Sequence, residues 1–350
     1  MIKFVFLIFG VLCFFAAVAG YSKDSRVSTA LAVLSALGLV LFAGLREIGI
    51  DQDSYGYLLY YNLSDGRMSL SAEPTFVLMA RIVRFISEDS GFRVLLVFYA
   101  FLGVLIKMWA ISKISENFWL AFLTYFSYFF FLHEFTQIRA GVASGLVLLS
   151  LYWVYHRNLR MFLVIIAIAS VFHFSALVAL PIYLLRNNFN LYIKIMIAIA
   201  IPLGLLFRGI NFNFALVLPS ELIASKIEVY TKLSESADLR LNIFNLFYLV
   251  KYVLLYLLLI FSDRIARRAK YFPLMLQMYA LSMFFYIALS FNTAFAMRIS
   301  EIFGVVEVVL IPTLIYITPV AVFGIIGVLI YGLGNLSIAM FETELIQSDT

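Results

Sequence analysis

Charged residues are scarce in this sequence. Of its 350 residues only 13% are Asp, Glu, Lys or Arg, whereas 64% are hydrophobic. A soluble domain carries about 25% charged and roughly 45–50% apolar residues, so the composition excludes an ordinary soluble protein. The single cysteine, Cys13, lies in an apolar run. The sequence therefore offers neither a disulfide framework nor a cysteine-based metal site.

Histidine is also rare, and His133, His156 and His173 lack HxxH or HExxH spacing. We therefore expect no metal centre built from histidines. The formal net charge of +5 is not gathered in a Lys/Arg block interleaved with aromatics, so we expect no nucleic-acid partner. The sequence also lacks Pro/Gly/Ser-rich linkers and repeats of fixed period, and we predict one transmembrane domain over residues 1–350.

Long apolar runs are what the sequence does contain. They predict an all-α fold, a polytopic integral membrane helical bundle of about 10–12 transmembrane segments. The first 20 residues also have features of a signal peptide, but the topology below requires them to stay as a helix. The predicted spans lie near residues 3–20, 28–45, 92–111, 117–132, 137–155, 191–207, 243–262, 271–291, 298–317 and 320–338.

Two further apolar regions fit this scheme poorly. In 74–88, Arg81 and Arg84 share one helical face, which predicts an amphipathic helix lying in the membrane interface. In 161–185, His173 stands near the middle, so this region is either one long span or two half-helices that meet at the histidine.

The positive-inside rule gives the predicted topology. Placing the Lys/Arg-rich loops in the cytoplasm puts 46–91 and 208–242 on the outer, periplasmic face, and 161–185 then dips in and returns. All the charged motifs described next fall on that outer face. The loops assigned to the cytoplasm are 21–26, 156–160, 186–194 and 263–270.

The motif REIGIDQDSYGY occupies residues 46–57, where the second predicted helix ends. An arginine beside several carboxylates offers an anion clamp, from Arg46, together with a candidate general base, Asp51. The other interpretation is that charges and tyrosines mark a helix end at the membrane interface.

Three later motifs also place polar groups at predicted helix ends. HEFTQIRAGVASG puts Arg139 at a helix N-terminus, which attracts anions, unless the arginine only snorkels to the surface. FHFSALVALP contains His173, which is either a packing residue or a functional group at a helix junction. NTAFAMRISEIFGVVEVV contains Arg298 and Glu301, which are spaced to pair with each other. It also contains the deeper Glu307, for which Lys251 is a candidate partner.

Together these motifs predict one site for a polyanionic ligand. The predicted outer face gathers arginines from four separate segments, along with Asp51 and His173. Because the scaffold is otherwise apolar, a lipid-linked diphosphate suits this pattern better than a soluble anion.

The sequence resembles the EpsG/Wzy-type family of bacterial polysaccharide polymerases over about residues 40–320. Four short motifs carry the resemblance in the expected order. They are Arg46…Gly49-Ile50-Asp51…Tyr55, TQIRAGVA, FHFSALVALP and MRISEIF.

The resemblance implies a helical glycosyltransferase of the GT-C type. Such an enzyme moves a growing glycan from undecaprenyl diphosphate onto a new lipid-linked repeat unit, for O-antigen, capsule or exopolysaccharide, at the outer face of the bacterial inner membrane. It uses no cofactor and no obligatory metal. The implied partners are undecaprenyl-diphosphate-linked glycans, membrane lipid and a co-polymerase that regulates chain length. Loop 208–242 is either a solvated loop, a lid or the contact for that co-polymerase.

In this mechanism we predict Asp51 as the catalytic base, with His173 as the second choice. Arginines surround the leaving diphosphate in place of a metal. The residues predicted to bind the diphosphate and its lipid carrier are Arg46, Arg139, Arg298, Arg81 and Arg84. The residues predicted to contact the glycan are Tyr55, Tyr57, Gln137 and Glu301.

Three other activities fit part of the same pattern. A lipid-linked oligosaccharide flippase is expected to have repeat symmetry and charged residues along the full depth of the membrane. The sequence shows neither. An O-antigen ligase shares the diphosphate donor and stays an alternative. An acyltransferase with His173 as its catalytic histidine is a third.

Overall fold

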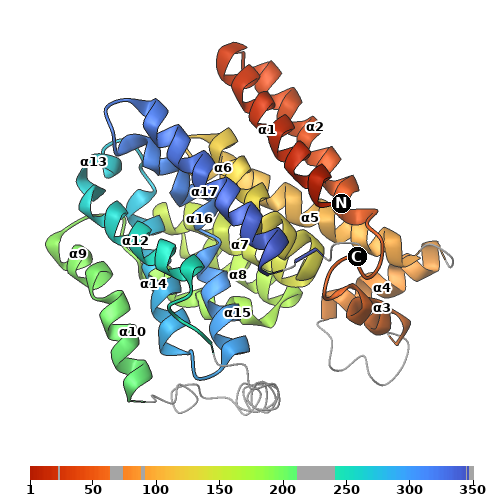
Figure 1. Cartoon of the computed structure of the whole chain (residues 1–350). Coiled ribbons are helices and arrows are strands. Elements are labelled where there is room, and N and C mark those ends of the chain that lie inside the picture. Colours follow the sequence, from red (N-terminus) through yellow and green to blue (C-terminus); the bar gives the residue numbers. More distant parts are fainter. Residues whose placement is uncertain (23, 64–73, 88–90, 211–240, 344, 347–350) are drawn as a thin grey trace. The chain divides into compact units, whose positions relative to one another are not determined.

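The computed structural model describes residues 1–22, 24–63, 74–87, 91–210, 241–343 and 345–346, and these residues form helices and no strand (Figure 1). The predicted all-α membrane fold is therefore confirmed. Of the predicted outer loop 208–242, residues 211–240 lie outside the described part of the chain.

Six helical segments of the described chain are long and apolar enough to cross a membrane. Each begins and ends within about five residues of a span predicted from hydropathy. The six are α1 (Ile2–Ser22), α2 (Ser25–Gly44), α5 (Gly91–Ile114), α7 (Ile138–Tyr155), residues Thr293–Tyr316 and α17 (Ala321–Phe341).

The six spans become up to seven if one bent pair counts as a span, fewer than the predicted 10–12. That pair is α9 (Leu191–Ala198) and α10 (Ala200–Gly209), which meet at 43°. The numbers differ because several regions predicted to cross the membrane form apolar helices shorter than 18 residues, whereas each of the six spans has at least 18 residues. The shorter helices are α6 with η2 (Phe118–Phe129), α8 (Leu159–Phe172), η4 (Phe174–Leu184), α12 (Leu246–Ile260) and α14 (Phe272–Ala288).

The chain divides into two compact units. Unit 1 comprises Met1–Leu180 and Val308–Thr350, and unit 2 comprises Pro181–Glu307. The single transmembrane domain predicted from the sequence stays a prediction.

In unit 1, α5 contacts α2, α7 and α4 (Pro74–Ile86), and α7 also contacts α8. The core beside them is aromatic. The segment α6 (Phe118–Thr124), η2 (Tyr125–Phe129) and η3 (Phe131–Thr136) packs Phe130 and Phe131 against Phe126 and Phe135, with ring centroids 5.2–5.6 Å apart. Both η2 and η3 are π-helical, a geometry that often marks functional sites.

The question left open for 161–185 is answered in favour of two segments. Helix α8 ends at Phe172, His173 has an extended backbone, and the 3₁₀ helix η4 begins at Phe174. Thr75 of α4 donates a hydrogen bond to the carbonyl of Val171 at 3.0 Å, so α4 packs against the end of α8. Of the region 74–88, residues Pro74–Ile86 are helical as predicted, and the place of this helix in the membrane interface stays a prediction.

In unit 2, α14 contacts α10, α12 and α15 (Thr293–Gly304). Lys251 of α12 and Glu307, the first residue of the short helix α16 (Glu307–Leu310), form a buried ion pair at 2.7 Å. The partnership proposed for these two residues from the sequence is therefore confirmed. Pairing removes the penalty of a lone buried charge.

One glycine in unit 1 sets a close helix contact. A Cβ on Gly324 of α17 would overlap the backbone of Ile315 and lie 2.8 Å from the carbonyl oxygen of Leu314, both in η6 (Ile311–Tyr316). We expect Gly324→Ala to lower stability by about 1–3 kcal/mol because the two helices must separate. Thermal unfolding in detergent measures this loss.

Gly327→Ala is the matched control on the same helix, since a Cβ there meets nothing within 4 Å. It should leave the melting temperature unchanged or slightly raised, because alanine favours the helix. Equal melting temperatures for Gly324→Ala and Gly327→Ala would contradict the close contact.

Candidate functional site

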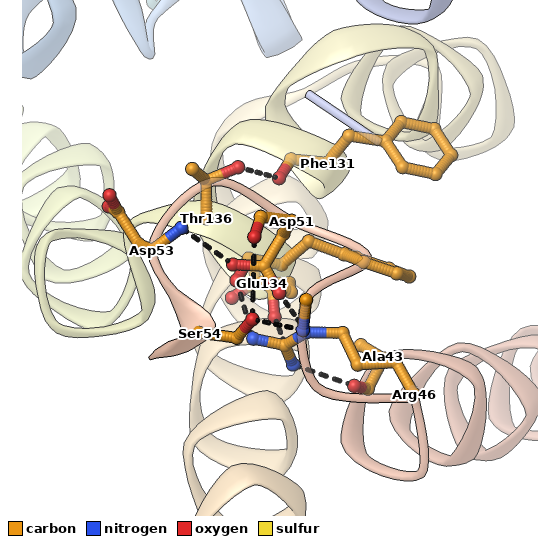
Figure 2. Close-up of polar contacts among 10 residues, drawn as sticks. Ala43, Arg46, Asp51, Asp53, Ser54, Phe131, Glu134 and Thr136 are labelled. Atoms are coloured by element: carbon orange, nitrogen blue, oxygen red, sulfur yellow. Dashed lines mark hydrogen bonds and ion pairs between the residues drawn. The ribbon is translucent and has the colours of Figure 1, made fainter. Parts of the chain in front are cut away.

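Arg46 follows the end of α2 and is buried (Figure 2). Its Nε donates to the Asp51 carboxylate at 2.8 Å. One terminal nitrogen donates to the carbonyls of Ala43, at 2.7 Å, and Glu134, at 3.4 Å. The other donates to the carbonyl of Phe135 at 2.5 Å. Arg46 thus joins the end of α2, the loop that follows it and the end of η3.

The loop from 46 to 54 is shaped by local hydrogen bonds. Gly49 has φ +96°, a left-handed conformation that favours glycine, and its amide donates to Ser54 Oγ at 2.8 Å. The amide of Asp53 donates to Asp51 Oδ1 at 3.1 Å (Figure 2). Asp51 is only 1% exposed, and both of its carboxylate oxygens accept hydrogen bonds. Its predicted role as the base stays a prediction.

Arg139 is the second residue of α7 and lies among aromatic rings. Its Cζ is 5.4 Å from the ring centroid of Tyr57, 5.9 Å from Tyr60 and 5.6 Å from Phe76. The two tyrosines come from α3 (Ser54–Asn62) and Phe76 comes from α4. Cation–π attraction holds the guanidinium against these rings.

The rings around Arg139 differ in exposure. Tyr57 and Phe76 are buried, whereas Tyr60 is 41% exposed and Arg139 itself is half-buried. The half-buried cation thus lies against two buried rings and one partly exposed ring. Gln137, predicted to contact the glycan, is the half-buried N-cap residue of α7 and makes no side-chain capping bond.

The other predicted residues of unit 1 lie at or near α3 and α4. Tyr55 is 67% exposed. Arg84 donates to the carbonyl of Tyr61 and lies over that ring, 4.6 Å from its centroid, so it ties α4 to α3. Arg81 is exposed. His173 is half-buried, and its Nε2 lies 3.2 Å from Ser175 Oγ.

Unit 1 thus brings together much of the predicted site. Arg46 and Asp51 are in direct contact, and Tyr57 touches Arg139. Helix α4 lies beside both Arg139, through Phe76, and the end of α8 before His173. Arg298, which is exposed, and Glu301, which is half-buried, belong to α15 in unit 2.

A second buried charge cluster of unit 1 was not predicted. Lys107 Nζ of α5 lies 2.7 Å from Glu134 Oε1 of η3, and Tyr125 of η2 donates to the same oxygen at 2.7 Å. The sequence indicated this pair only weakly, through a lysine within an apolar helix, Lys107, and a glutamate shortly before Arg139, Glu134. Tyr60 and Phe76 were missed because aromatic residues are common in this chain.

The arrangement can bind an anion. Arg139 carries a planar, permanently charged donor, and the first amides of α7 add the positive end of the helix dipole. The described residues hold no cluster of three or more His, Cys, Asp or Glu side chains suited to a metal ion.

The sequence was compared with known families, curated proteins and solved structures. No curated protein and no solved structure matches the chain. The model of the EpsG family matches residues 29–341, which include every residue of the site described above. The chain therefore belongs to the EpsG family, and this membership implies a role in exopolysaccharide biosynthesis.

Proposed function

We propose that this protein polymerises undecaprenyl-diphosphate-linked repeat units. In this reaction a growing glycan passes from its lipid diphosphate carrier to a hydroxyl of a new lipid-linked repeat unit. The observation that carries the proposal is Arg139, a half-buried cation at a helix N-terminus beside an exposed tyrosine ring. A diphosphate suits the cation and the helix dipole, and a sugar face suits the ring.

The proposed step forms a bond between the acceptor oxygen and the anomeric carbon of the growing glycan. The bond from that carbon to the diphosphate oxygen breaks, and the lipid diphosphate leaves with both bonding electrons. Arg139 stabilises the charge that develops on the leaving oxygens. The proton of the acceptor hydroxyl passes to a general base.

We now favour His173 as that base and give Asp51 a positioning role. His173 is half-buried, and its Nε2 lies 3.2 Å from Ser175 Oγ. Asp51 is 1% exposed and already accepts hydrogen bonds from Arg46 and from the amide of Asp53. Breaking that buried pair to free a base is unfavourable.

We further propose that the enzyme lies in the bacterial cytoplasmic membrane with its site on the outer face. The Lys/Arg-rich loops support this orientation through the positive-inside rule. A chain-length-regulating co-polymerase is the proposed protein partner, and Arg81 is proposed to contact the lipid carrier from α4.

The test uses the purified protein in nanodiscs with its lipid-linked repeat unit as the only substrate. We expect a ladder of products on a gel, each longer by one repeat unit. A ligase would make no ladder, and it would transfer glycan only after a second, different lipid acceptor is added. Transbilayer movement of the repeat unit in sealed proteoliposomes, without any longer product, would indicate a flippase. Either of these two results would replace the polymerase proposal.

A further inference from the structure

The buried cluster of Lys107, Glu134 and Tyr125 has no part in the step proposed above. Lys107 Nζ lies 2.7 Å from Glu134 Oε1 and also donates to the carbonyl of Gly141 at 2.7 Å. The side chains of Lys107 and Glu134 are fully buried. Lys107 therefore connects α5 to η3 and to the first turn of α7 with one ammonium group.

Stability gives little reason for such a pair. Replacing a buried ion pair by apolar side chains of similar volume is often neutral or stabilising, because burial removes the water that solvated both charges. Ionisable side chains inside a membrane protein more often have a functional use. The contacts of this pair show what it orients.

The pair acts on the same backbone that holds Arg46. Where η3 ends, the amide of Gln137 donates five residues back, to Leu132, at 2.8 Å. The carbonyls that follow Leu132 lie in the last turn of η3, where a carbonyl has no amide partner within the helix. Two of these carbonyls, of Glu134 and Phe135, accept hydrogen bonds from Arg46. The side chain of Glu134 is thus held by Lys107 while its backbone carbonyl binds Arg46.

The pair also acts on the backbone that carries Arg139. The carbonyl of Gly141, which accepts from Lys107, stands two residues after Arg139 in the first turn of α7. That carbonyl also accepts a hydrogen bond from Ser144 Oγ at 3.0 Å. Lys107 therefore fixes the position of the helix start from which Arg139 projects.

Gly103 leaves room for the Glu134 carboxylate in this orientation. Glu134 Oε1 accepts two hydrogen bonds, while the buried Oε2 accepts none from the described residues. Oε2 lies against Gly103 of α5, one helical turn before Lys107, and a Cβ at Gly103 would overlap it. Any side chain at position 103 must therefore move the carboxylate.

We propose that Lys107, Glu134 and Gly103 are positioning residues that set Arg139, and through Arg46 the 46–54 loop, in the geometry that binds the lipid diphosphate. This inference rests on the proposed function for its substrate. A displacement of about 1 Å at a catalytic group can lower a rate about 10²-fold. A change at Gly103 should therefore act at the site without any contact to substrate.

The experiment is a double-mutant cycle between Gly103→Ala and Arg139→Ala in nanodiscs. We expect Gly103→Ala alone to lower kcat/KM for the lipid-linked repeat unit about 10–100-fold. In the Arg139→Ala background the same change should lower it less than about 3-fold, because the group it positions is gone. A full additional loss in that background would overturn the proposal, since a merely structural role is indifferent to Arg139.

Two further variants keep the test decisive. Gly38→Ala in α2, where a Cβ meets nothing within 4 Å, is the matched control and should have wild-type kinetics. If Gly103→Ala does not fold, Lys107→Met with Glu134→Gln removes both charges together and replaces it in the cycle.

Binding of undecaprenyl diphosphate alone, measured by native mass spectrometry, separates this inference from the proposed function. If wild type binds the lipid without lengthening any glycan, and Gly103→Ala and Arg139→Ala both weaken binding non-additively, the positioning role stands and the polymerase proposal fails. If wild type lengthens glycans and Gly103→Ala matches it, only the positioning role fails. A wild type that does not bind the lipid overturns both.

Discussion

Arg46→Ala should lower the stability of the protein by about 3–5 kcal/mol. The change leaves Asp51 as an unpaired charge that is 1% exposed. It also removes the donor to the carbonyls of Ala43, Glu134 and Phe135, and each buried acceptor left without a partner costs about 1–3 kcal/mol. Thermal unfolding in detergent, followed by fluorescence-detected size exclusion, measures the loss.

A control variant shows whether the loss of stability is specific to Arg46 or follows from removing any arginine. Arg160→Ala in α8 is the matched control, because Arg160 is exposed, and it should melt like wild type. Asp51→Asn keeps an acceptor for Arg46 and should lie between the two. If Arg46→Ala and Arg160→Ala have the same melting temperature, the hydrogen bonds of Arg46 do not hold the 46–54 loop. The positioning role proposed for Asp51 is then wrong.

The polar residues at helix ends could be predicted from the sequence. Long apolar runs define the ends of helices with little ambiguity, since each membrane span needs about 20 apolar residues. Arg46 and Arg139 each stand at such an end, and the structure has α2 ending at Gly44 and α7 beginning at Ile138. The break at His173 was one of two alternatives, because apolar periodicity does not separate a long helix from two short ones.

The contacts between those ends could not be predicted. The hydrogen bonds from Arg46 to Glu134 and Phe135 cross 88 and 89 residues of sequence, and a hydropathy pattern holds no information on such pairing. The same applies to Lys107 and Glu134, whose charges looked like isolated exceptions within apolar segments. Burial divides the predicted residues into two groups. Arg46 and Asp51 are enclosed and structural in their contacts, whereas Arg139 and His173 are half-buried.

This division gives the second large prediction. Arg139→Ala should lower glycan lengthening about 10²–10³-fold, the effect of removing one preorganised donor to developing charge. The loss should appear with little change in melting temperature, because Arg139 is half-buried and its rings still pack on one another, as Tyr57 and Phe76 do at 5.9 Å. The ladder assay in nanodiscs gives the rate, and thermal unfolding of the same samples gives the stability.

Arg139→Lys separates charge from geometry. Lysine keeps the positive charge but lacks the planar pair of donors and stacks less well on rings, so we expect it to recover only part of the lost rate. Full recovery would mean that a point charge is sufficient and that bidentate binding of a diphosphate is not required. A wild-type rate for Arg139→Ala would remove the diphosphate site from the start of α7. Because Arg46→Ala should act through folding and Arg139→Ala through rate, the two variants together separate an arginine that stabilises the fold from one that acts in the reaction.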